Sequence, residues 1–274
     1  MRLLIEHRTE YRFTQPQARV VQMLRMTPGS HIGQSIVNWR IDVDCDARLK
    51  QSRDGFGNII SMLYLQGPVD RIGLSVSGEV LTEDRAGVVM GANEPLPSAV
   101  FRRPTELTAS DSFLEEVVRA HASSGSPLSR VHALCTAVHE AIRSNPGRSA
   151  EIRTASEIMS AANGCSMDMA HVLIAAARVA GFAARFITGY IYSDAPDSAH
   201  RQAPHFWAEI DVPEYGWIAF DPFNDVCPQE RYVRVARGLD YRDAAPISGA
   251  RIGGGHEVLN VGVGVTLSQG QHQR

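Results

Sequence analysis

The feature that most constrains this sequence is the stretch 163–171 and the apolar run 172–180 that follows it. Gly164 and small polar residues lead directly into a segment rich in Ala, Leu, Ile and Val. This pattern predicts a buried helix that begins at Cys165 or Ser166. A helix start presents unpaired N–H groups and the positive end of the helix dipole, which stabilise a developing thiolate or oxyanion. The segment is therefore a candidate position for a nucleophile.

The composition is that of an ordinary globular chain. The 274 residues are 44% hydrophobic and 21% charged, with a formal net charge of −3 and a pI of about 6.4. This balance gives no reason to expect nucleic acid or an anionic membrane surface as a partner. No apolar run approaches the roughly 18 residues of a membrane span, since Arg178 interrupts even residues 172–180. We therefore expect no nucleic-acid partner and no membrane span.

The cysteine pattern favours a reducing compartment. The four cysteines form no Cys-x-x-Cys pair and have no histidine at zinc-finger spacing; they are Cys45, Cys135, Cys165 and Cys227. The N-terminus lacks the apolar core of a signal peptide, because Glu6 follows after only three apolar residues. We expect a cytoplasmic protein that needs no metal and no cofactor.

The chain divides into two regions joined by a proline-rich segment. Residues 1–91 show short alternating runs punctuated by Gly, Pro and Asp, which predict an antiparallel β domain. Residues 92–108 contain three prolines and predict a linker of extended chain. Residues 109–274 predict a second domain of helices and strands, whose tail ends in an alternating strand after the glycine loop 253–255.

Helix-start signals precede the central stretch. Ser110 or Asp111 can cap a first helix, and Pro127 stands at the opening of a second. Thr154 and Glu157 have the spacing of a capping box for a third, shorter helix. These signals predict a helical cluster before residue 163.

Two later strands bring a histidine and a carboxylate together. The runs 205–210 and 217–222 flank a short polar turn and predict a hairpin. If Glu209 lies opposite Trp217, then His205 lies opposite Asp221 on the same face, because the side-chain period is two. A base oriented by a carboxylate beside a nucleophile is the arrangement of acyl-transfer triads. The same residues also fit a His–Asp pair that only stabilises the hairpin.

Four blocks, in this order and spacing, resemble the bacterial transglutaminase-like superfamily: residues 164–171, 181–190, 205–209 and 216–222. Segments on both sides are also similar to such proteins: residues 11–13, 24–28, 54–58 and 232–246. The resemblance implies an α+β fold with an N-terminal β domain and a papain-like transglutaminase core of helices and an antiparallel sheet. It also implies a Cys-His-Asp triad that hydrolyses amide bonds or transfers the acyl group to an amine.

The resemblance assigns His205 as the base and Asp221 as its orienting acid, but the residue at the nucleophile position differs from the family pattern. That pattern runs Gly, apolar, Cys, any residue, Asp, aromatic or Met, Ala, His. Aligned on Asp168, it puts Cys165 on the apolar position and Ser166 on the cysteine. Serine loses its proton only during attack, so a site shaped for a thiolate–imidazolium pair loses most of its rate.

Three accounts of position 166 are open. Ser166 is an introduced substitution that silences a cysteine enzyme, or it is a natural change that gives a serine-dependent or inactive relative. In the third account the turn is remodelled so that Cys165 attacks, although one residue along a helix turns a side chain by about 100°.

Five further residues lie in the same sequence blocks as the candidate triad. Asp168 and His171 match the family pattern, and we expect them to lie within the helix, either supporting the triad residues or as structural groups, rather than to belong to the triad. Trp207 stands beside the base and either shields it from water or belongs to the core. Arg185 and Tyr190 lie on the strand after the helix and are candidates to reach the cleft.

The sequence thus predicts an amidase or protease, or an acyl transferase, that acts on a peptide or protein substrate at peptide or isopeptide bonds. The rival interpretation is a catalytically silent member of the same fold that binds peptides or serves as a scaffold.

Overall fold

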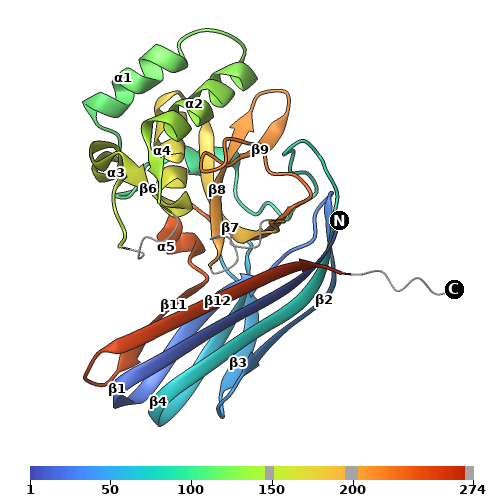
Figure 1. The fold of residues 1–274 in the computed structure, drawn as a ribbon, viewed down its shortest axis with the longest axis vertical. Helices are drawn as coiled ribbons and strands as arrows, with labels where there is room; N and C mark the ends of the chain where they lie inside the picture. Colours follow the sequence, from blue (N-terminus) through green and yellow to red (C-terminus); the bar gives the residue numbers. More distant parts are fainter. Residues whose placement is uncertain (146–150, 195–202, 269–274) are drawn as a thin grey trace, which may run out of the picture.

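The computed structural model describes residues 1–145, 151–194 and 203–268. It contains a six-stranded and a four-stranded antiparallel sheet, with a short parallel pair of β5 (Arg143–Ser144) and β6 (Asn163–Gly164). Figure 1 shows the long strands of the first sheet in the lower half and the helices with the second sheet in the upper half. This is the predicted α+β architecture.

Two long strands form the centre of the six-stranded sheet. β1 (Arg2–Thr27) pairs with β4 (Ile59–Thr82), and β2 (Gln34–Val43) and β3 (Arg48–Arg53) pair with β4 on its other side. Alternate residues in the first half of β1 are buried, as a period of two requires. The short runs in the sequence are therefore parts of long strands that continue through register shifts.

The C-terminal tail completes this sheet. β11 (Ile247–Ile252) and β12 (Glu257–Leu267) pair antiparallel with the two halves of β1, and the glycine loop 253–255 joins them. The sequence pattern predicts that these residues belong to the second domain, which they follow in the chain. Pairing between strands so distant in sequence leaves no local signal, so their membership of the first sheet is a correction.

The proline-rich segment 92–108 is more ordered than an extended linker. It contains the 3-10 turn η1 (Ser98–Arg102), on which Phe101 is only 1% exposed. The ring of Phe101 packs edge-on against Trp217 with centroids 5.4 Å apart. The prolines exclude regular helix and strand, but they do not prevent side chains between them from joining the core.

The second half is built on a sheet with the strand order β10 (Tyr232–Gly238), β7 (Ala183–Ile191), β8 (His205–Val212) and β9 (Gly216–Phe220). α4 (Ser166–Val179) packs on β7 and β8. Three helices surround α4: α1 (Ser112–His121), α2 (Pro127–Ala141) and α3 (Ala155–Ala161). Every residue of α4 from Ser166 to Ala177 is buried, which confirms the predicted buried helix.

The helices begin at the predicted caps. The side chain of Asp111 accepts a hydrogen bond from the N–H of Leu114, and Pro127 lies in the first turn of α2. Thr154 and Glu157 form the capping box of α3. Each cap satisfies N–H groups that a first helical turn leaves unpaired.

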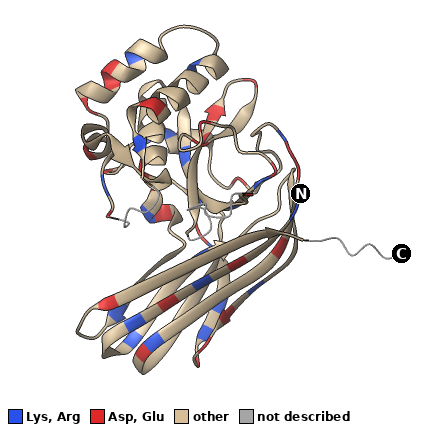
Figure 2. Cartoon of the chain, in the orientation of Figure 1, with Lys and Arg blue, Asp and Glu red and all other residues tan. Residues whose placement is uncertain are grey.

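Charges are mixed over the molecule. Acidic and basic positions are interspersed along the strands and helices of both halves (Figure 2). None of the helices in residues 1–145, 151–194 and 203–268 has the length and apolarity to cross a membrane.

Candidate active site

The hairpin of β8 and β9 places His205 beside Asp221. Nε2 of His205 lies 2.7 Å from Oδ2 of Asp221, and the two side chains are 3% and 0% exposed. An isolated buried carboxylate is costly, so a partner at this distance is what allows it to remain ionised. The structure thus contains the contact between His205 and Asp221 that the sequence predicts.

The register of this hairpin differs from the prediction. Asp211, not Glu209, lies opposite Trp217, which is a shift of two residues. The turn takes only the three residues 213–215, with Glu214 in the left-handed conformation at φ 73°. Because the side-chain period is two, a shift of two leaves every side chain on its predicted face.

Asp221 is held by several donors. Its Oδ2 also accepts hydrogen bonds from the Tyr232 hydroxyl at 2.8 Å and from Nδ2 of Asn224 at 2.7 Å, and its Oδ1 accepts one from the N–H of Phe223 at 2.9 Å. Burial raises the pKa of this carboxyl, but the charge of a protonated His205 and these hydrogen bonds outweigh burial and hold the pKa below its ordinary value. The ionised carboxylate can therefore fix the imidazole in one orientation.

Aromatic rings enclose the His205 imidazole. Trp207, 1% exposed, lies stacked beside it with centroids 6.3 Å apart. Phe223 and Tyr232 approach edge-on at 5.9 and 6.0 Å. Such surroundings strengthen the electrostatic contact between base and acid, because they limit access of water.

The start of α4 is fixed by a buried carboxylate. Ser166 is the first residue of the helix and is 9% exposed. Oδ2 of Asp168 accepts hydrogen bonds from the N–H of Cys165 at 3.0 Å and from Arg153 at 2.7 Å. Asp168 is 1% exposed, so its placement agrees with the expected structural role at the helix start.

Cys165 lies in a setting that suppresses thiolate formation. It is the residue before the first turn of α4, and its Sγ lies 3.5 Å from Oδ2 of Asp168. Burial and the negative charge of Asp168 raise the pKa of the thiol to about 11. A reactive cysteine requires the opposite shift.

His171 connects two helices in the interior. Its side chain is fully buried, and its Nε2 accepts a hydrogen bond at 3.1 Å from the N–H of Tyr241, the first residue of α5 (Tyr241–Ala244). Burial lowers the pKa of His171 to about 4, so the ring is neutral at pH 7. This placement agrees with the expected structural role.

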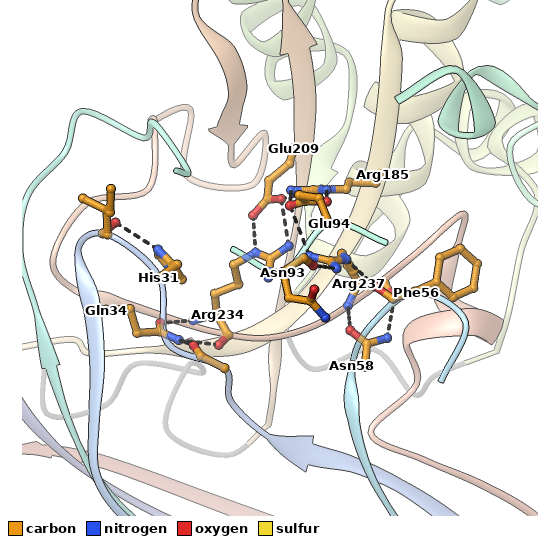
Figure 3. Close-up of polar contacts among 12 residues, drawn as sticks. His31, Gln34, Phe56, Asn58, Asn93, Glu94, Arg185, Glu209, Arg234 and Arg237 are labelled. Atoms are coloured by element: carbon orange, nitrogen blue, oxygen red, sulfur yellow. Dashed lines mark hydrogen bonds and ion pairs between the residues drawn. The ribbon is translucent and has the colours of Figure 1, made fainter. Parts of the chain in front are cut away.

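Arg185 and Tyr190, the two candidates to reach the cleft, lie at the junction with the first sheet. Arg185 is opposite Glu209, and its Nε donates to that carboxylate at 2.6 Å (Figure 3). The Tyr190 hydroxyl lies 3.0 Å from Nδ1 of His7 on β1. Gly189 is the residue paired with His205, so its neighbour Tyr190 points to the opposite face.

Both halves of the chain match known families. Residues 3–81 match the bacterial transglutaminase-like N-terminal region, and residues 115–222 match the transglutaminase-like superfamily. The chain belongs to the transglutaminase-like superfamily. Within residues 115–222 of this transglutaminase-like chain lie Ser166, His205 and Asp221.

Similar proteins extend the match over nearly the whole length. An uncharacterized protein of Mycobacterium tuberculosis is 29% identical over 277 residues, which cover 90% of this chain and 87% of that protein. An uncharacterized protein of Mycobacterium leprae is 25% identical over 276 residues, which cover 97% and 98% of the two chains. A crystal structure of a candidate cysteine protease from Cytophaga hutchinsonii has a TM-score of 0.77 at 19% identity, covering 97% of this chain and 90% of the other. This last likeness shows the fold.

Two further residues of this transglutaminase-like site are not among the predicted ones. Tyr232 and Asn224 both donate to Asp221. Asn224 follows Asp221 by three residues, so a turn with side-chain to carboxylate bonding was a detectable signal. Tyr232 comes from β10, a strand that pairs with β7 rather than with the hairpin, and no local pattern reveals that approach.

Proposed function

We propose that this transglutaminase-like chain is an amide hydrolase or acyl transferase that acts on peptide or isopeptide bonds. The nucleophile is the side chain at position 166, the base is His205 and the orienting acid is Asp221. The observation that carries the proposal is the buried 2.7 Å contact between His205, the first residue of β8, and Asp221. That contact supplies a base of fixed orientation, and the start of α4 supplies a favourable potential for an anion.

The chemistry follows from the atoms available. Nε2 of His205 is engaged with Asp221, so we assign the proton transfer to the other ring nitrogen, Nδ1. The Oγ of Ser166 forms a bond to the substrate carbonyl carbon as its proton passes to His205. The imidazolium then returns that proton to the departing amine as the C–N bond breaks. Water or a second amine releases the acyl group from Oγ by the same sequence in reverse.

Position 166 is a better candidate than Cys165. Ser166 stands at the first helical residue, whereas the Cys165 thiol is held protonated by burial and by Asp168. A pKa of about 11 leaves little thiolate at neutral pH.

A second candidate function is peptide binding without catalysis. The observation that favours it is Ser166 itself, because a serine hydroxyl is far less acidic than a thiol and a site shaped for a thiolate gives it little assistance. In that case the same fold recognises a peptide or serves as a scaffold.

We propose a cytoplasmic location and a reaction without metal or cofactor. Nucleophile, base and acid all come from the chain itself. The described cysteines, Cys45, Cys135, Cys165 and Cys227, are all free thiols, which suits a reducing compartment.

The test uses the Ser166→Cys variant and iodoacetamide. If His205 and the start of α4 act on position 166, the new thiol is deprotonated below its ordinary pKa of about 8.5 and labels at pH 6 about tenfold or more faster than Cys165. Peptide mass spectrometry locates the label. Turnover is measured on peptides with Gln- and Glu-linked amide bonds, with and without an added amine.

Two controls separate the candidates. Replacing His205 by Ala in the Ser166→Cys background should abolish the rapid labelling, while Ser166→Ala should give no turnover. If the Ser166→Cys variant labels no faster than Cys165 and turns over no peptide, the enzyme proposal fails and peptide binding becomes the better assignment. If Ser166 itself turns over substrate and Ser166→Ala does not, the serine is the working nucleophile.

A further inference from the structure

A cluster of charged side chains lies at the junction of the two halves, and we call it the junction cluster (Figure 3). Its members come from β7, β8, β10 and the proline-rich segment: Glu94, Arg185, Glu209, Arg234 and Arg237. The side chains of the three arginines are 0%, 11% and 4% exposed, and that of Glu209 is 0% exposed. The side chain of Glu94 is 32% exposed, so solvent reaches this member, whereas the other four lie largely outside the reach of solvent screening.

Each carboxylate of the junction cluster is shared between guanidinium groups. Glu209 accepts one hydrogen bond from Arg185 at 2.6 Å and two from Arg234 at 2.6 and 3.1 Å. Glu94 receives two hydrogen bonds from Arg185 at 2.7 and 3.1 Å and one from Arg237 at 3.2 Å. The cluster thus contains three positive groups and only two negative ones, which leaves one excess positive charge. A buried uncompensated charge is costly, so a negative group from outside would stabilise this arrangement.

A pocket of about 460 Å³ adjoins the excess charge. Its walls include Arg234 and Arg237 from β10, Asn58 and Asn93, and Arg53 on the outer edge of β3. No Asp or Glu is among the described residues that line it. Within the described part of the chain, Nη1 of Arg234 has no hydrogen-bond partner. Arg237 already donates to Glu94 and to the backbone carbonyls of Phe56 and Asn93. The free donor that the pocket offers is therefore Nη1 of Arg234, with the exposed Arg53 at the pocket wall, at a junction of the kind where ligand pockets are common.

We propose that this pocket binds a carboxylate, as the acidic side chain of a peptide or as a small organic acid. The planar guanidinium fork matches a carboxylate, and the cluster already holds two carboxylates in this way. The single excess charge suits a monoanionic group. Glu209 is four residues from His205 along β8, about 13 Å at the strand rise, so this site is separate from the candidate triad and does not depend on its activity.

The test measures binding by calorimetry at low salt to three probes. N-acetyl-glutamate N-methylamide represents a peptide side chain, glutarate represents a free organic acid, and inorganic phosphate represents an oxyanion of another shape. The variants are Arg53→Ala and Arg53→Glu, because Arg53 is exposed and its replacement spares the buried core. Arg48→Ala, an exposed arginine on the same strand that does not line the pocket, is the matched control.

We expect saturable binding of at least one carboxylate probe, and which of the two binds more tightly identifies the source of the carboxylate. Arg53→Ala should weaken binding about three- to tenfold and Arg53→Glu by more, because a charge-assisted contact is lost and then a repulsion is added. Arg48→Ala should bind like the unmodified chain. The proposal is overturned if neither carboxylate binds at about 10 mM, if phosphate binds as tightly as the carboxylates, or if Arg48→Ala and Arg53→Ala weaken binding equally.

Discussion

Replacing Glu209 by Gln tests whether the junction cluster is held by its buried carboxylate. Burial alone raises the pKa of Glu209, but the charges of Arg234 and Arg185 and their hydrogen bonds outweigh it and lower the pKa from 4.5 to about 2. At 1.36 kcal/mol for each pKa unit, this preference for the ionised form corresponds to about 3 kcal/mol of folding free energy. Removing one partner of a buried pair costs about 3 to 5 kcal/mol in comparable cases. We therefore expect Glu209→Gln to lower the free energy of unfolding at pH 7 by about 3 kcal/mol.

The effect of Glu209→Gln on stability should depend on pH in a definite direction. A carboxyl with a lowered folded-state pKa stabilises the native state above its unfolded pKa, and this stability is lost as pH falls toward the folded value. The difference between the unmodified chain and Glu209→Gln should therefore be constant above about pH 5 and shrink as pH falls from 4.5 toward about 2. Urea denaturation followed by tryptophan fluorescence at several pH values measures it.

The control is Glu106→Gln, which breaks the exposed pair of Glu106 with Arg242 at 2.7 Å, with side chains 70% and 54% exposed. This change should lower the free energy of unfolding far less than Glu209→Gln does, because solvent screens an exposed ion pair. If Glu209→Gln costs no more than Glu106→Gln at pH 7, or if its cost does not depend on pH below 4.5, then the carboxylate is not what holds the junction cluster together.

The remaining predictions concern the surroundings of His205. Tyr232→Phe, made in the Ser166→Cys background, removes a hydrogen bond to Asp221 and should lower kcat/KM about tenfold. Because that bond helps to lower the pKa of Asp221, its loss should also move the acidic limb of the pH profile to higher pH. A loss of rate without that movement would contradict a positioning role for Tyr232. Gly189→Ala should lower the free energy of unfolding by about 3 kcal/mol or more, since a Cβ there would overlap the carbonyl oxygen of Val233 and the Trp207 ring. Gly262→Ala on β12, where a Cβ would meet open space, is its control, and equal effects on urea denaturation would count against the packing argument.

Local patterns in the sequence predicted the parts of the fold that depend on local physics. The caps at Asp111 and Thr154 and the buried helix after Cys165 follow from hydrogen-bonding needs and apolar content within a few residues. The pairing of His205 with Asp221 was predicted on the right face although the register was wrong by two, because only the parity of the register decides the face.

Features that depend on distant pairing were not predictable in this way. The junction of β10 with β7 brings Tyr232 to Asp221 and Arg234 to Glu209, and it joins strands about 40 residues apart in the sequence. The partners of Arg185 were not predictable either. An arginine on a strand near a helix is a candidate to reach a cleft, because the sequence gives no sign of the carboxylates that it contacts. The resemblance to a family supplied the order of the candidate triad, but it did not supply these contacts.

The position of β1 has a consequence for synthesis of the chain. β1 is synthesised long before β11 and β12, which are its two neighbours on one side. Until they arrive, the backbone N–H and C=O groups along that side of β1 have no strand to pair with, which exposes an edge capable of joining another chain. The helical half, from α1 to α5, can form while that edge is still unpaired. A nascent chain stopped near residue 246 would therefore carry the complete candidate triad together with an unfinished sheet, and its tendency to associate would come from the unpaired side of β1.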